Sequence, residues 1–126
     1  MIARDLPGSL QLAYLGDTIY DLYVRERLVR AGGRMDDMHR AAVRLVRASA
    51  QSAALTRIEP LLSAEEAAVV RRARNARQTP PRNADIHDYH RATALEALIG
   101  ALYLSGEKAR IDELMEVAIE DCEIHG

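Results

Sequence analysis

Two carboxylates stand in segments that are otherwise apolar. Asp17 lies in LAYLGDTIYDLYV, where its neighbours at helical spacing are mostly alanine, leucine, tyrosine and valine. Glu96 lies in ATALEALIGALYL, and no cation occurs between Ala92 and Gly106. Because an ionised carboxylate is costly to bury alone, each acid must face solvent, pair with an arginine or bind a metal ion.

The sequence leaves two explanations for these acids. A single acid of this kind is explained by an interhelical salt bridge or by exposure at a helix edge. Two acids in the two most apolar helices, which we expect to pack together, would instead meet in a small acidic cavity. Carboxylate oxygens suit Mg²⁺, which keeps several waters and takes one or two protein carboxylates. Spacing alone does not choose between a salt bridge and a metal site.

Arginines gather around a proline-containing segment, QTPPRNADIHD, that predicts a loop. They are opposed there only by two aspartates and comprise Arg71, Arg72, Arg74, Arg77, Arg82 and Arg91. They form either a solvated helix end or a phosphate-binding cluster, in which Asn75 and Gln78 would reach ribose hydroxyls or base edges of A-form RNA. A second line of basic residues, Arg40, Arg44 and Arg47, has the same two explanations.

The elements that position these residues are predicted to be helices only. Apolar residues recur at helical spacing, Gly32 and Gly33 end the first helix, and Ser63 with Glu66 forms a capping box. No alternating strand pattern of useful length occurs. The sequence therefore predicts an all-α fold of five helices, over about residues 9–28, 36–59, 63–75, 88–105 and 111–119.

Composition limits the class of protein. With 126 residues, of which 48% are hydrophobic and 29% charged, we expect one domain over residues 1–126. The net charge of −2 excludes a strongly basic nucleic-acid binder but not a locally basic face. The single cysteine, Cys122, is typical of a reducing compartment, so we expect a cytoplasmic protein, with no membrane-spanning segment.

The tyrosines and the most apolar helix bear on assembly. Tyr14, Tyr20, Tyr23 and Tyr103 fall in the two apolar helices and are expected in the core or in an interface. The fourth helix carries more apolar surface than a five-helix monomer needs. We therefore expect a homodimer.

The order of these segments resembles a known family. YLGDTIYDLYVRERL followed by TALEALIGALYL resembles the two signature segments of ribonuclease III catalytic domains. The intervening MHRAAVRLVRASAQ, EEAAVVRRARNAR and YHRATALEALIG resemble the Mini-ribonuclease III subfamily, whose members lack a double-stranded-RNA-binding domain. The resemblance covers nearly the whole chain and implies the helical bundle of a ribonuclease III endonuclease domain.

The resemblance also implies a site. Asp17 and Glu96 match the catalytic, metal-binding acids, with Mg²⁺ as the cofactor and Mn²⁺ as a substitute. Ala13 and Thr93 stand where full-length ribonuclease III enzymes carry two further carboxylates, which leaves the number of metal ions open. Asp21 is either an outer-shell carboxylate or a surface partner of Arg25. With the resemblance, RNA contact becomes the favoured role of the arginines around the loop and of the two amide side chains among them. These residues are Arg71, Arg72, Arg74, Asn75, Arg77, Gln78 and Arg82.

The function implied is metal-assisted hydrolysis of phosphodiesters in double-stranded RNA by a homodimer, leaving 5′-phosphate and 3′-hydroxyl ends. Its implied substrate is the precursor of large-subunit (23S) ribosomal RNA. The alternative is a catalytically inactive helical module that binds RNA or the ribosome. It arises because Ala13 and Thr93 leave the metal site with fewer protein ligands. A purely structural dimerisation domain is the third possibility. The presence of both Asp17 and Glu96 favours the enzyme.

Overall fold

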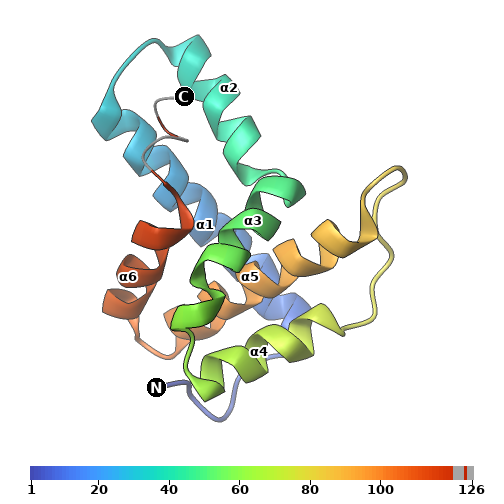
Figure 1. The fold of residues 1–126 in the computed structure, drawn as a ribbon. Helices are drawn as coiled ribbons and strands as arrows, with labels where there is room; N and C mark the ends of the chain where they lie inside the picture. Colours follow the sequence, from blue (N-terminus) through green and yellow to red (C-terminus); the bar gives the residue numbers. More distant parts are fainter. Residues whose placement is uncertain (121–123, 125–126) are drawn as a thin grey trace.

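A computed structural model of the protein describes residues 1–120 and 124. Its described residues form six α-helices and one 3-10 turn, and they contain no strand, which confirms the all-α prediction (Figure 1). The elements are α1 (Ser9–Ala31), α2 (Met35–Val46), α3 (Ala48–Ile58), η1 (Glu59–Leu61), α4 (Ala64–Arg74), α5 (Ile86–Leu104) and α6 (Lys108–Ala118). Cys122 lies outside the described residues. Within the described part, no helix combines the length and apolar character that crossing a membrane requires.

Helix α5 is the central element of the fold. It packs against α1, α3 and α4, with α1 crossing on the far side in the view of Figure 1 and α3 on the near side. Every residue from Arg91 to Leu102 is buried except Glu96, which is half-buried. A helix surrounded in this way is apolar on most of its faces, and the other buried polar residues here, Arg91 and Thr93, have hydrogen-bond partners. The single interruption in its burial is therefore at the acid that stands out in the sequence.

Two glycines allow α1 and α5 to cross at backbone contact. A Cβ atom on Gly16 would lie 1.7 Å from the carbonyl oxygen of Glu96, and one on Gly100 would lie 2.1 Å from the carbonyl oxygen of Leu12. Any side chain at either position would force the helices apart. The crossing therefore brings the turn that carries Asp17 directly onto the turn that carries Glu96.

The predicted second helix is wrong in one respect, because it is two helices. Arg47 has an extended backbone, with φ −67° and ψ 157°, and it caps both the end of α2 and the start of α3. The bend directs α2 onto α1 and α3 onto α5, so that each buries its own apolar face. Neither glycine nor proline marks this position, and the break follows from tertiary packing.

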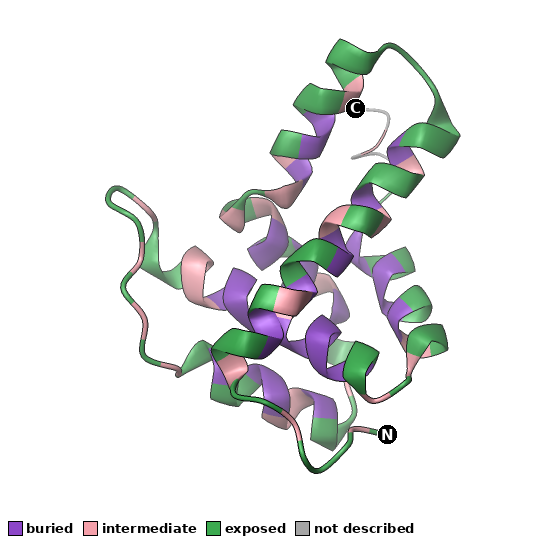
Figure 2. Cartoon of the chain, turned by 180° about the vertical axis from the view of Figure 1, so that it is seen from behind, coloured by how far each residue is buried: buried purple, intermediate pink, exposed green. Residues whose placement is uncertain are grey.

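The start of α4 follows the predicted signal, whereas α5 begins at Ile86 and α6 at Lys108, slightly earlier than the expected residues 88 and 111. The hydroxyl of Ser63 accepts a hydrogen bond from the Glu66 amide at 3.1 Å, while Glu66 accepts one from the Ser63 amide at 2.9 Å. Asp85 caps α5 by accepting from the Asp88 amide. Between α4 and α5, residues 75–85 form a largely exposed arm that projects from the bundle (Figures 1 and 2).

The tyrosines differ in burial, and one expectation about apolar surface needs correction. Tyr20 is buried, but Tyr14 is 85% exposed and Tyr103 is also exposed, so neither belongs to the core of the single chain. Between residues 92 and 102 the apolar residues of α5 are covered by helices of the same chain, as the purple core in Figure 2 shows, and the exposed ones, Ile86, Tyr103 and Leu104, lie at the helix ends. The apolar middle of this helix is therefore not a reason to expect a dimer.

Candidate active site

Asp17 on α1 and Glu96 on α5 meet at the helix crossing. Their carboxyl groups lie close enough to share a hydrogen bond when one of them is protonated. Asp17 is exposed and Glu96 is half-buried, so the pair forms an open acidic site at the surface rather than a closed cavity. The expected convergence of the two acids is confirmed, and the expected enclosure is wrong because α1 leaves the outer side of Asp17 uncovered.

The pair is electrostatically unfavourable without a cation. Burial, together with the neighbouring carboxyl of Asp17, raises the pKa of Glu96 to about 8, whereas the amide of Gln51 opposes the shift. No arginine or lysine forms an ion pair with either acid within the described part of the chain. The salt-bridge explanation for these two acids therefore fails, and a divalent cation would supply the missing positive charge.

Gln51 of α3 is a third polar residue at this site. Its side chain is 2% exposed, and its Nε2 donates to Glu96 Oε2 at 3.4 Å and to the Val46 carbonyl at 3.1 Å. It is absent from the site residues predicted from the sequence. The sequence did contain a sign that Gln51 is buried, because it shares a helix face with Ala54, Leu55 and Ile58, which are apolar and buried.

The remaining candidate ligands do not join the pair. Asp21, one turn after Asp17, forms an ion pair with Arg25 at 3.2 Å. This agrees with the second of its two expected roles, that of a surface partner of Arg25. Ala13 has no ligating atom, and Thr93 is buried with its hydroxyl donating to the Tyr89 carbonyl. In the described residues, no group of three or more His, Cys, Asp or Glu side chains could hold a metal ion. The two carboxylates present fit Mg²⁺, which accepts one or two protein oxygens and retains water for its other positions.

The predicted RNA-contacting residues lie at the end of α4 and on the arm. Arg71, Arg72, Arg74, Asn75, Arg77 and Arg82 lie at least partly at the surface, and none of these arginines has an ion-pair partner among the described residues. Gln78 differs, because it donates to Thr93 Oγ1 at 3.1 Å and contacts His90 Nδ1 at 3.3 Å. Since Thr93 lies one turn before Glu96, Gln78 joins the base of the arm to the helix that carries the acidic site.

Arg91 is not part of the exposed basic cluster. It is 8% exposed and donates to the Ser52 hydroxyl at 3.0 Å, the Thr56 hydroxyl at 2.7 Å and Glu59 Oε1 at 2.9 Å. These contacts tie α5 to α3 and the following turn. Of the two roles left open for Arg91, its burial does not support phosphate contact, because its guanidinium is hydrogen-bonded inside the protein.

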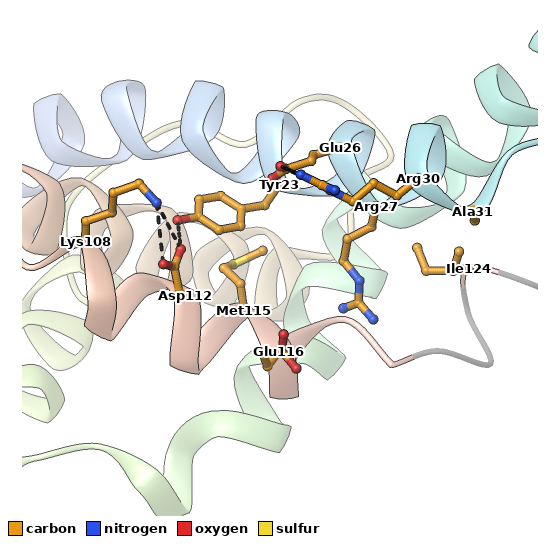
Figure 3. Close-up of a pocket in the computed structure, with 10 residues that line it drawn as sticks. All are labelled: Tyr23, Glu26, Arg27, Arg30, Ala31, Lys108, Asp112, Met115, Glu116 and Ile124. Carbon is orange, nitrogen blue, oxygen red and sulfur yellow. Dashed lines mark hydrogen bonds and ion pairs between the residues drawn. The ribbon is translucent and has the colours of Figure 1, made fainter.

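A groove of about 630 Å³ between α1 and α6 is separate from the acidic pair (Figure 3). Tyr23 and Lys108 both reach Asp112, and Arg30 pairs with Glu26 at 3.1 Å. Charges of both signs lie along this groove and largely neutralise one another. Neither Asp17 nor Glu96 lines it.

The helical fold and the paired acids agree with the comparisons to known proteins. Residues 10–107 match the ribonuclease III domain. Mini-ribonuclease 3 of Symbiobacterium thermophilum is 46% identical over 113 residues, covering 88% of this chain and 87% of the relative. Mini-ribonuclease 3 of Brevibacillus brevis is 47% identical over 121 residues, covering 93% and 90%. A crystal structure of a protein from Fusobacterium nucleatum superposes with a TM-score of 0.80 at 33% identity, covering 87% of this chain and 89% of that one.

The chain therefore belongs to the ribonuclease III domain family, and the relatives that it matches over most of their length are Mini-ribonuclease 3 proteins. This confirms the family resemblance drawn from the sequence. The match to residues 10–107 includes both acids and the basic arm between them.

Proposed function

We propose that the protein is an endoribonuclease that hydrolyses phosphodiester bonds in double-stranded RNA with the aid of Mg²⁺, for which Mn²⁺ can substitute. The observation that carries this proposal is the meeting of Asp17 and Glu96 without a basic partner among the described residues, at the crossing of α1 and α5. Membership of the ribonuclease III family supports the reaction class.

Asp17 and Glu96 are the residues that would hold the cation. When bound, Mg²⁺ supplies an activated water and neutralises charge on the phosphate oxygens. The exposed side of Asp17 leaves room for a phosphodiester to approach, while Glu96 is half-buried where α1 and α3 pack against its helix. The protein's own contribution is to fix the two carboxylates on rigid helices before substrate arrives.

The arginines on α4 and the arm would bind the RNA backbone. Their side chains carry positive charge that no described acid neutralises, and the guanidinium group suits bidentate contact with phosphate oxygens. Asn75 is exposed beside them, and Gln78 lies at the base of the arm. Because Gln78 is hydrogen-bonded inside the protein, we assign it to holding the arm and keep direct RNA contact for Asn75 and the arginines.

A homodimer is supported by apolar side chains that are exposed on α1 and α5. Leu10, Tyr14 and Leu22 are exposed on α1, and Tyr103 is exposed on α5. Tyr14 lies one helical turn before Asp17, so a second copy that covers Tyr14 would flank the site. Two sites related by a two-fold axis suit the two strands of a duplex. A monomeric mass in light scattering at micromolar concentration would contradict this arrangement.

The substrate and location that we propose are the precursor of large-subunit (23S) ribosomal RNA and the cytoplasm. The chain resembles Mini-ribonuclease 3 proteins over most of their length, and the single cysteine suits a reducing compartment. Incubation with precursor and with mature ribosomal RNA, followed by mapping of the cut ends, tests the substrate. Ends that differ from those of the mature RNA would contradict it.

The deciding experiment compares cleavage and binding. Long double-stranded RNA should be cut by the wild-type protein with Mg²⁺ and remain intact in a chelator. Asp17→Asn and Glu96→Gln should each reduce cleavage by at least roughly 100-fold while leaving duplex affinity within about threefold, because binding rests on the arginines. Wild-type protein that binds duplex without cutting it would instead support the inactive RNA-binding module. Near-wild-type cleavage by either variant would remove that acid from the site.

A further inference from the structure

Gln51 occupies a position in which its amide has only one workable orientation. The amide nitrogen has two protons, and both have acceptors, Val46 O at 3.1 Å and Glu96 Oε2 at 3.4 Å. With Glu96 ionised, as it must be to hold a cation, turning the amide over would place its oxygen against a carbonyl and a carboxylate, which can only accept. The bond from Gln51 Nε2 to the Val46 carbonyl at the end of α2 therefore fixes the amide so that its second proton faces Glu96.

The break in the chain at Arg47 creates this arrangement. Val46 is the last residue of α2, so its carbonyl has no partner further along that helix. Gln51 lies near the start of α3, and its backbone amide donates to the Arg47 carbonyl at 3.0 Å. One side chain thus links the end of α2 to a carboxylate on α5.

Packing alone does not explain the amide. Gln51 Oε1 is buried and has no hydrogen-bond partner within the described residues, which is unfavourable for the folded state. An apolar side chain of similar length would fill the same space without that cost. The residue is explained instead by the bond that its nitrogen makes to Glu96, and this bond becomes charge-assisted when Glu96 is ionised.

We propose that Gln51 is a positioning residue, which holds Glu96 Oε2 so that the Glu96 carboxylate faces Asp17 in a single orientation for binding a divalent cation. This inference rests on the proposed function, since it concerns the same pair of acids. Outer-shell hydrogen bonds that orient a ligand commonly change metal affinity by roughly 10–100-fold.

The test uses Gln51→Met, which keeps length and volume but removes the donor. Mn²⁺ binding to the RNA-free protein, followed by the decrease of the free-ion EPR signal, should weaken about tenfold. The Mg²⁺ concentration for half-maximal cleavage should rise by a similar factor, while the cleavage rate at saturating Mg²⁺ stays within about threefold of wild type. Unchanged Mn²⁺ affinity in a folded Gln51→Met protein would overturn the role of Gln51.

Ser52→Ala is the matched control. Ser52 is the next residue on α3, is also buried and also bonds across to α5, but its partner is Arg91 rather than Glu96. This variant should have lower thermal stability and unchanged Mn²⁺ affinity. Equal weakening of Mn²⁺ binding in both variants would assign the effect to general loosening of α3 and overturn the proposal.

A measurement on the wild-type protein covers the case in which Gln51→Met does not fold. In an ¹⁵N-resolved NMR spectrum, the assigned Gln51 side-chain amide should exchange slowly with water and should shift when Mg²⁺ is added. No shift of this resonance, while the Asp17 and Glu96 backbone signals do move, would overturn the proposal. A wild-type protein that neither binds Mn²⁺ nor cleaves RNA would refute the proposed function itself, and the role of Gln51 with it.

Discussion

The α-carbon of Gly16 lies against the backbone carbonyl of Glu96, so closely that a Cβ atom on Gly16 would stand 1.7 Å from that oxygen. Gly16 directly precedes Asp17 in the chain. The distance between the two acids is therefore set by a contact between helix backbones, and it does not depend on long flexible side chains.

Gly16→Ala should destabilise the protein by about 2–3 kcal/mol or more, because the added methyl group meets backbone atoms that cannot rotate away. Urea unfolding measures the difference from wild type. Gly8→Ala is the control: its nearest contact would be the Gln11 side chain at 4.0 Å, and its expected cost is no more than about 1 kcal/mol. Equal stabilities of the two variants would contradict the close crossing.

Glu96 should make the metal-free protein less stable as pH rises. Its pKa is about 8 in the folded state, against an ordinary value of 4.5, so the folded protein binds the proton more tightly than the unfolded chain. The stabilising contribution is fully present below pH 4.5 and is lost as pH rises through 8. In a chelator at a pH of about 9, Glu96→Gln should therefore exceed wild type in free energy of unfolding by roughly 1–3 kcal/mol. Parallel pH profiles for the two proteins would refute this.

Replacing Arg72, Arg74 and Arg77 together by alanine should weaken duplex binding and make it less sensitive to salt. Each arginine that binds a phosphate contributes about 0.9 to the slope of log affinity against log salt, so a decrease of roughly 2–3 is expected. The circular dichroism spectrum should be unchanged, because none of the three side chains is buried. An unaltered affinity and slope would assign these arginines to solvent.

Arg91→Ala should lower the stability of the protein and leave the salt dependence of duplex binding unchanged, which is the reverse of the effect expected for the three surface arginines. Without the guanidinium, the buried Ser52 hydroxyl loses its partner, whereas the exposed Thr56 and Glu59 can bond to water, so the expected cost is about 1–2 kcal/mol of stability. The salt dependence of duplex binding by the folded fraction should equal that of wild type. A reduced salt slope with normal stability would return Arg91 to the RNA-binding cluster.

The contrast between Arg91 and its neighbours shows where sequence reasoning reaches its limit. The helix ends at Gly32, Ser63 and Asp85 depend on local signals, and the meeting of Asp17 with Glu96 follows because two strongly apolar helices must pack together. The burial of Arg91 depends on Ser52, which is 39 positions away, and the role of Gln51 depends on Glu96, which is 45 positions away. Local pattern carries no information on such pairs, and it gave no sign of the bend at Arg47.

The separation of the two acids along the chain has a consequence for the protein during its synthesis. Asp17 is made first, whereas Glu96 and the rest of α5 follow only after α2, α3 and α4 have been translated. Because the acids are brought together by the α1–α5 crossing, a nascent chain attached to the ribosome has no complete acidic site until α5 has emerged. Under the proposed function, an enzyme whose substrate is RNA would thus be inert on the ribosome until α5 has emerged.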